Sequence, residues 1–557
     1  MRPRVIYRHR PRFRQPEFAD RTGRSHLWDR ARDIAGVIWL PALVALVPLI
    51  YYWPVLQSGF VSDDYFFYSI FKWNAGDFLR LFFARQPADS LFPYFRPAAF
   101  VSFKLDYLIW GADAVGFHFT NLLLHSVNAV LLFFVLRAIG FGRIASAAAG
   151  LVFGLYPTNP EAVTWVSGRF DLLALTWLLV AILLWCRARL MHDDRLLYLA
   201  GVAFLIAVFS KEVAVAGLVL FPLADWLMHL DTRRKWGQGI GFHWAWYIVF
   251  FAIVICALAY RYRILGGLGG FHGEYFPRPY ASVGPSEFWN NLTIYDLKIL
   301  FTPMNRILWA EWGTVFHAVV IAAGALVWLG LAASAVRAAI LLRRIDETAV
   351  VRVLGGIVWI VAFLLPVAPV SGVSDSLDYS RLLYAPSAGL AMWIASAVEM
   401  GWAKSSMWRV ITAVVVIVAI LVSGAALRRN NEAWIEAGEI AGLIHANMAT
   451  YSRDLPDNSS IFIINYPLLW KGAHCAPLAY GGYLEFRDGI KGVEIIIQRK
   501  EPGEIYGWWD EILQRWDRPG IGFVWHPETR EIEALPRIKP QQQSGDVFGE
   551  LMGPEVS

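Results

Sequence analysis

The chain has 557 residues, of which 57% are hydrophobic and 26 are Trp, and its formal net charge is +5. Soluble domains are about 45–50% apolar, so this composition excludes an ordinary soluble globular protein. The basic residues lie in short clusters between apolar runs, which argues against nucleic-acid binding. Three cysteines are too few to suggest a disulfide framework.

A basic tail, residues 1–33, leads into a long series of apolar segments. A helix that spans a bilayer needs roughly 20 apolar residues. Segments of this kind, some of them shorter, predict about 11 transmembrane helices and therefore an all-α polytopic membrane protein. They lie at 34–56, 117–139, 144–157, 170–186, 196–210, 212–230, 240–260, 314–342, 353–370, 382–399 and 408–427.

The distribution of Arg and Lys predicts the orientation of the module 34–427, because cytoplasmic loops are enriched in these residues. With the N-terminal tail in the cytoplasm, only the cluster Arg428 and Arg429 falls on the wrong side. The other clusters, which all fall inside, are at 137–143, 187–195, 233–235, 343–352 and 404–409. The long loop 57–116 is then extracytoplasmic, and the short loops fit a cell (inner) membrane.

The region 428–557 follows the last of an odd number of spans, so it is predicted to be extracytoplasmic. It has the pattern of a small α/β domain, with a helix around 433–451 and strands at 459–467, 493–497 and 520–526. We expect this domain to shape access for an acceptor rather than to carry catalysis.

The outer loop begins with FVSDDYFFYSI, residues 60–70, in which Asp63 and Asp64 stand among aromatic side chains. Adjacent residues point in different directions, so both carboxylates cannot face one ligand. A capping role at a short helix near Tyr65 is the alternative. Further along, WNAGDFLRLFFARQ, residues 73–86, predicts either a helix in the membrane interface or a segment packed on protein.

Many ionisable residues collect on the predicted outer face, where they either line a polar cavity or pair among themselves at the interface. They are Asp63, Asp64, Arg96, Asp106, His118, Glu161, Arg169, Asp171, Lys211, Glu212, Asp378 and Arg381. For His118 and His125, a pair of packed histidines is the favoured interpretation.

Several sequence blocks resemble one known family. They are FVSDDYFFYSI, the stretch 95–133, LYPTNPEAVTWVSGRFDLLAL, FSKEVAVAGLVLFPLADW and SRLLYAPSAGL. Together they resemble the transmembrane O-mannosyltransferases with tetratricopeptide repeats and, more broadly, the GT-C superfamily of polyprenyl-phosphate-sugar transferases. The chain departs from the family at Tyr156-Pro157, where His-Pro is usual, and at Ser380, where Glu is usual. No tetratricopeptide repeat is seen after the last predicted span.

The resemblance implies a GT-C-like membrane glycosyltransferase with its active site on the outer face. It would move a sugar, mannose in the resembling family, from a polyprenyl-phosphate donor to a hydroxyl on a protein, glycan or lipid, with inversion. It also implies that Asp63 or Asp64 is the general base, with Asp63 favoured. No general acid is needed, because phosphate leaves as an anion, in contrast to glycoside hydrolysis.

The leaving phosphate requires fixed cations. Arg381 is the first choice, because a guanidinium can bind phosphate at two points, and Arg169 and Lys211 follow. For Arg169 and Lys211, ion pairs with Asp171 and Glu212, respectively, are alternatives of equal standing to phosphate binding.

Glu161 is expected to orient the acceptor or to bind a metal ion. Carboxylate oxygens from Asp63, Asp64 and Glu161 would suit Mg²⁺ or Mn²⁺, and metal dependence stays open.

Two other classes of function compete with this prediction. A transporter or flippase of lipid-linked glycans predicts inverted repeats and charges near the bilayer midplane, whereas these charges collect on one face. A non-catalytic assembly protein is disfavoured, because the acidic and basic residues named above are all present.

Overall fold

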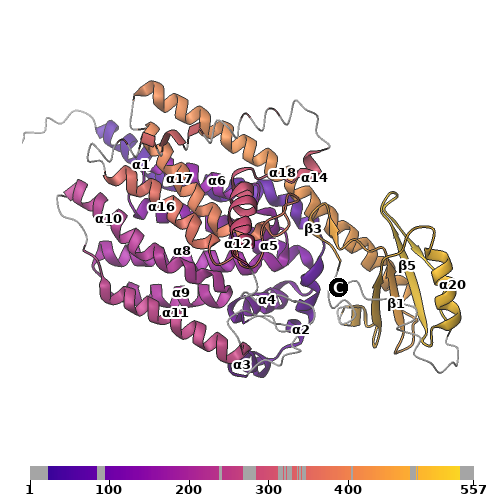
Figure 1. Ribbon diagram of the computed structural model, residues 1–557. Helices are drawn as coiled ribbons and strands as arrows, with labels where there is room; N and C mark the ends of the chain where they lie inside the picture. Colours follow the sequence, from indigo (N-terminus) through magenta and orange to yellow (C-terminus); the bar gives the residue numbers. More distant parts are fainter. Residues whose placement is uncertain are drawn as a thin grey trace, which may run out of the picture.

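The computed structural model describes residues 23–84, 95–236, 241–266, 284–310, 347–402, 405–476, 484–485 and 487–539, with scattered positions between 318 and 340. A bundle of helices lies at one end of the molecule and a β-sheet at the other (Figure 1). Both are joined by α18, Ser406–Tyr451, a helix of 46 residues that extends beyond the bundle.

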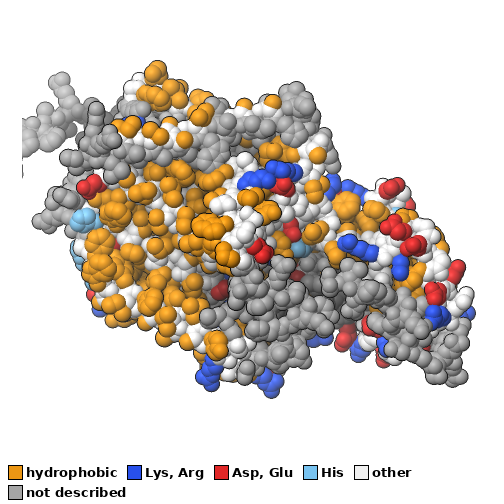
Figure 2. Space-filling model, viewed as in Figure 1, with side chains coloured by type: hydrophobic (Ala, Val, Ile, Leu, Met, Phe, Trp, Pro, Cys, Tyr) orange, Lys and Arg blue, Asp and Glu red, His pale blue; other side chains and the backbone are white. Residues whose placement is uncertain are grey.

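Long apolar helices build the bundle. Besides α18 they are α1 (Gly23–Tyr52), α5 (Ala114–Ala138), α6 (Arg143–Gly154), α8 (Arg169–Met191), α9 (Arg195–Ser210), α10 (Leu220–Trp236), α11 (Trp244–Leu265), α16 (Glu347–Leu364) and α17 (Tyr384–Trp402). In the described part of the chain, eight stretches are long and apolar enough to cross a membrane, and α6 and α9 are shorter apolar helices. Hydrophobic side chains cover most of the bundle surface in Figure 2, and charged ones gather toward the sheet.

The prediction of an all-α polytopic membrane protein with a C-terminal α/β region is confirmed. Ten of the predicted spans coincide with these helices. The remaining one, 314–342, lies largely outside the described residues.

Polar side chains join the helices inside the bundle, because buried polar groups of a membrane-spanning bundle need hydrogen-bond partners. Asn128 of α5 donates to the carbonyl oxygen of Leu172 in α8 at 3.0 Å and to the Tyr384 hydroxyl at 3.1 Å. His125 Nδ1 lies 2.9 Å from the same hydroxyl, and its Nε2 lies 3.0 Å from the Gly154 carbonyl oxygen. His125 is therefore a packed histidine, as expected.

Short elements lie between the long helices on the side of the bundle that faces the sheet. In the first loop they are η1 (Trp53–Gln57), η2 (Ser62–Phe66), α2 (Phe67–Lys72), α3 (Ala75–Phe83) and α4 (Pro97–Trp110). Later ones are α7 (Pro160–Val163), η3 (Val166–Gly168), η4 (Glu212–Val219), α12 (Pro285–Trp289), η6 (Asn290–Leu297), α13 (Lys298–Phe301), α14 (Arg306–Trp309) and η7 (Ser380–Leu383).

Helix α3 falls within the predicted interfacial segment 73–86. Asn74 caps it by accepting hydrogen bonds from the backbone N–H groups of Gly76 and Asp77. Leu81 is buried, whereas Leu79 and Phe83 are 59% and 70% exposed. Exposed apolar side chains on an amphipathic helix suit a place at the membrane interface.

A four-stranded sheet forms the C-terminal region, in the order β4-β1-β5-β6, with β1 parallel to both of its neighbours. Its strands are β1 (Ser460–Ile464), β4 (Glu494–Gln498), β5 (Gly520–His526) and β6 (Glu531–Ala534). Alternate side chains of β1 face opposite sides, so Phe462 packs with α20 (Ile505–Arg515), and Ile461 with the core that includes α18. The three predicted strands are confirmed, and the expected domain boundary at 427 lies inside the unbroken helix α18.

Candidate functional site

The two adjacent aspartates of η2 lie in different environments. Asp64 Oδ2 accepts a hydrogen bond from the Val61 N–H at 3.1 Å, and its Oδ1 accepts from both the N–H and the hydroxyl of Ser167 at 2.8 Å. Ser62 has a φ of 48°, so the backbone turns sharply just before the pair. Asp64 is thereby a buried cap that fixes the loop, which matches the capping alternative for that residue.

Asp63 faces positive charges instead. Burial raises the pKa of its carboxyl, and the charges of Arg381, His474 and Arg96 partly oppose this rise. Those three residues come from η7, the sheet region and the first loop, so the fold gathers them around one carboxylate. Asp63 and the first-choice cation Arg381 therefore belong to the same polar region.

Arg381 is held by Glu161, which is fully buried in α7. Glu161 accepts hydrogen bonds from the Arg381 backbone N–H at 2.9 Å, from its guanidinium, and from the Ser380 hydroxyl at 3.2 Å. The guanidinium carbon lies 4.9 Å from the centre of the Trp165 ring and 5.2 Å from that of Tyr379. Aromatic faces and one carboxylate thus fix the orientation of this cation.

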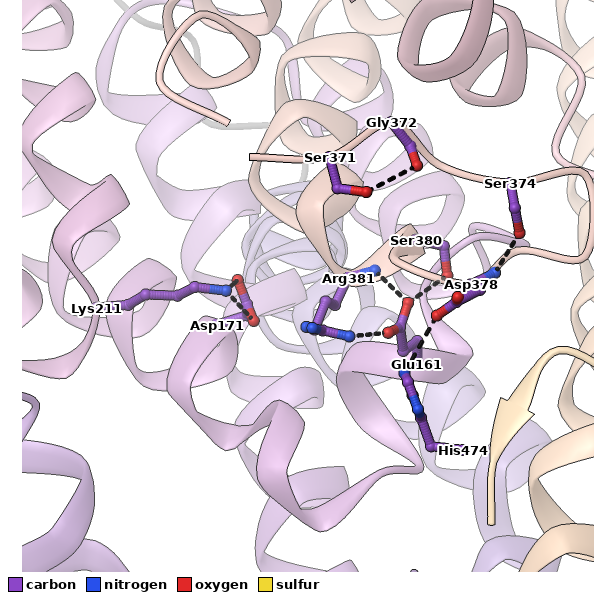
Figure 3. Close-up of polar contacts among 10 residues, drawn as sticks. All are labelled: Glu161, Asp171, Lys211, Ser371, Gly372, Ser374, Asp378, Ser380, Arg381 and His474. Atoms are coloured by element: carbon purple, nitrogen blue, oxygen red, sulfur yellow. Dashed lines mark hydrogen bonds and ion pairs between the residues drawn. The ribbon is translucent and has the colours of Figure 1, made fainter. Parts of the chain in front are cut away.

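Figure 3 shows a second cation, Lys211, on the side of Arg381 that is opposite Glu161. Lys211 donates to both carboxylate oxygens of Asp171 at 2.7 Å. Glu212 binds Arg96 at 2.7 Å and Arg261 at 3.2 Å. The alternative pairing of Lys211 with Glu212 is therefore wrong, because α9 ends at Ser210 and the chain turns Lys211 and Glu212 toward different partners.

Arg169 is enclosed by protein. Its side chain is 0% exposed and lies 2.6 Å from Asp106, and it donates to Asn121 Oδ1 and to the Phe117 carbonyl oxygen, both at 2.8 Å. The alternative pairing of Arg169 with Asp171 is wrong, since α4 and α5 supply these partners. Of the predicted phosphate ligands, Arg169 thus has its charge satisfied inside the protein, whereas the charge of Arg381 acts on Asp63.

Two further residues lie near Arg381: Asp378, which the sequence placed only among the charges of the outer face, and His474, which was not predicted at all. Asp378 precedes η7, and His474 ends the short strand β3 (Ala473–His474) that pairs with β2 (Leu469–Trp470). His474 Nε2 lies 3.1 Å from Asp378 Oδ1, and the imidazole stacks on Trp165 with ring centres 4.9 Å apart. A lone histidine more than 300 positions from Glu161 gives no signal in the sequence that could reveal this placement.

Chemically, this arrangement combines a partly buried carboxylate with oriented cations at the junction of the bundle and the sheet region. Such a set can hold an anionic group and accept a proton from a neighbouring hydroxyl.

The comparisons with known proteins agree with the resemblance seen in the sequence. No family model matches the chain. Protein O-mannosyl-transferase Tmtc1 of Drosophila melanogaster is 31% identical over 234 residues, which cover 41% of this chain and 26% of that protein. The chain is similar to the protein O-mannosyl-transferases.

Further relatives belong to the same group. Tmtc2 of Drosophila melanogaster is 36% identical over 145 residues, or 25% of this chain and 16% of the relative. Human TMTC4 is 32% identical over 120 residues, or 19% of this chain and 16% of the relative. The chain spans about a quarter or less of the length of these curated relatives.

Crystal structures of ArnT from Cupriavidus metallidurans align with 89% of this chain and 94% of that chain. The apo form gives a TM-score of 0.43 at 15% identity, and the form bound to undecaprenyl phosphate gives 0.41 at 14%.

Proposed function

We propose that this protein is a membrane glycosyltransferase that moves a sugar from a polyprenyl-phosphate donor to a hydroxyl acceptor. The observation that carries the proposal is that the charges of Arg381 and Arg96 act on the buried carboxylate of Asp63. The similarity to protein O-mannosyl-transferases supports mannose as the sugar and a protein as the acceptor.

Asp63 is the general base in this proposal. Its carboxylate takes the proton of the acceptor hydroxyl while the hydroxyl oxygen attacks C1 of the donor sugar. The attacking oxygen approaches C1 from the side opposite the phosphate. The C1–O bond to the phosphate breaks as the new bond forms, so the anomeric centre inverts. The polyprenyl phosphate leaves as an anion, and the proton stays on Asp63 until it passes to solvent.

Arg381 is the principal phosphate ligand. Glu161 binds one edge of the guanidinium, and the other nitrogens make no hydrogen bond to any described residue, so they remain available to an anion. Lys211 and Arg96 add positive charge near it, although each already has a carboxylate partner. Glu161 then acts by orienting Arg381 rather than by touching the acceptor.

Replacing Arg381 tests this assignment. We expect Arg381→Lys to raise the KM for the donor on the order of tenfold, equivalent to about 1.4 kcal/mol, because an ammonium cannot keep two-point contact with phosphate while bound to Glu161. The matched control is Arg518→Lys, an arginine of the sheet region that is paired with Glu494 at 2.8 Å and has no role in the proposed site. An unchanged KM in Arg381→Lys would remove Arg381 from the donor site.

An experiment in sealed vesicles that contain the purified protein distinguishes transport from sugar transfer. The donor carries one label in its sugar and a second label in its lipid, and both labels are followed. Transfer predicts that the sugar label appears on an added acceptor while free polyprenyl phosphate accumulates. Movement of the intact donor across the bilayer, with both labels still joined, would favour a flippase and contradict the proposal.

A further inference from the structure

Three side chains from three separate parts of the chain meet beside Arg381. Glu161 lies in α7, Asp378 in the loop before η7, and His474 in the β2–β3 hairpin. One ligand atom of each lies within 4.8 Å of those of the other two. Figure 3 shows the three side chains converging from the bundle and from the sheet region.

The contact between His474 and Asp378 has the spacing of two ligands of one ion. Nε2 and Oδ1 are 3.1 Å apart, both are shielded from solvent, and neither makes a hydrogen bond to a described residue. Metal bonds of about 2.0–2.1 Å place two neighbouring ligand atoms roughly 3 Å from each other. An ion between these atoms would satisfy both of them.

The hairpin holds His474 firmly in place. Its turn consists of Lys471 and Gly472, whose φ angles of 51° and 91° are both positive, as the tight two-residue turns of hairpins require. Asn305 donates to the Lys471 carbonyl oxygen at 2.8 Å, and Trp470 donates to Glu436 of α18 at 2.7 Å. The imidazole is thus oriented before any ligand binds.

The charges of the cluster favour a dication. With His474 neutral, as a metal-binding imidazole must be, Glu161 and Asp378 carry two negative charges, and Arg381 balances only one of them. Arg381 and Ser380 bind Glu161 and fix its carboxylate, in the way that outer partners orient metal ligands. Two carboxylates and one imidazole are ligands that Zn²⁺ and Mn²⁺ accept.

We infer that Glu161, Asp378 and His474 form a binding site for a divalent transition-metal ion, Zn²⁺ or Mn²⁺, that ties the sheet region to the helical bundle. This set differs from the one expected from the sequence, because of Asp63, Asp64 and Glu161 only Glu161 belongs to it. Three protein ligands leave at least one coordination position open. The inference does not rest on the proposed glycosyl transfer, since metal content is measured without a substrate.

Metal content of the full-length protein tests the inference. The protein is purified with a tag that contains no histidine, stripped with chelator, incubated with Zn²⁺ or Mn²⁺, dialysed, and measured by plasma mass spectrometry. We expect about one ion per chain in the parent and less than a tenth of this in His474→Ala and in Asp378→Asn. His526→Ala is the matched control, because His526 also faces a carboxylate, Glu533, at 3.0 Å in the same region, and it should keep the ion.

Spectroscopy distinguishes an ion bound by His474 from an ion bound elsewhere on a variant. With Mn²⁺ bound, pulsed electron paramagnetic resonance should show nitrogen modulation from one imidazole in the parent and in His526→Ala, and none in His474→Gln. A parent without bound metal after incubation, or an equal metal content in His474→Ala and the parent, would overturn the inference. His474 and Asp378 would then form an ordinary ion pair.

Discussion

At the residue scale, Asp63 and Asp64 show how neighbouring carboxyl groups are given separate roles. Three hydrogen bonds commit Asp64 to backbone and to Ser167, and only Asp63 is left facing the cations. The divergence of adjacent side chains predicts only that the two carboxylates cannot share one role, and the family resemblance implies that one of them is the base. The sequence could not decide which one from the residues alone, since Ser167 lies in a different element, 103 positions from Asp64.

The pH dependence of transfer should report Asp63. Burial raises the pKa of Asp63 above the ordinary 3.8, and the base must be deprotonated to act. We therefore expect kcat/KM to rise with pH along an acidic limb whose midpoint lies above 3.8. Arg96→Gln removes a charge that lowers this pKa, so it should move the limb to higher pH. A limb that stays in place in Arg96→Gln would contradict the assignment.

Asp64 should instead affect stability. Burial raises the pKa of Asp64 from 3.8 to about 7, so the folded protein favours the protonated carboxyl. Its contribution to the free energy of unfolding is complete below the unfolded pKa and is lost as the pH rises through the folded value. We expect the Tm in detergent to fall between about pH 4 and about pH 7 in the parent, and to fall less in Asp64→Asn.

Asp113→Asn is the control for that comparison. Asp113 is an exposed cap of α5 that accepts from the Val115 N–H, and Asn can replace it there. The control should keep the pH slope of the parent. An equal slope in all three proteins would show that Asp64 does not titrate in this range.

At the scale of elements, the β2–β3 hairpin connects the sheet region to the site. A methyl group at Gly472 would lie 2.2 Å from the Ser376 carbonyl oxygen, so the hairpin turn and the loop before η7 are in close backbone contact. That loop is fixed further by Asp296, which accepts from the Val373 N–H at 3.1 Å, and by Arg306, which binds Asp375 at 2.7 Å. The position of Asp378 and Arg381 therefore depends on elements far apart in the sequence.

Gly472→Ala should separate these elements. Alanine at this position must adopt a left-handed backbone conformation, which costs about 1–2 kcal/mol. Its methyl group would also collide with Ser376. We expect a lower Tm and a loss of transfer activity of at least tenfold. Gly489→Ala is the matched control, because Gly489 also has a positive φ, 73°, but open space around its added methyl group. Equal effects of the two substitutions would show that the contact with Ser376 is unimportant.

For the whole molecule, the sequence predicts the helical part well and the site only partly. Apolar segments give the helices because length and hydropathy are local properties. The strands 460–464 and 520–526 are likewise readable, since each is a short apolar run. By contrast, the contact of His474 with Asp378 and Trp165 arises only when the hairpin docks on the bundle. Orientation in the membrane and the domain boundary at 427 remain predictions.

Sugar transfer by the Asp63→Asn variant tests the proposed role of Asp63 as the general base. We expect purified Asp63→Asn to lose at least about 100-fold in kcat with a polyprenyl-phosphate sugar donor, because the amide cannot take the acceptor proton. Asp113→Asn, in the same outer loop, should transfer sugar at the parent rate. If Asp63→Asn transferred sugar at the rate of the parent, with both proteins equally folded, Asp63 would not be the general base.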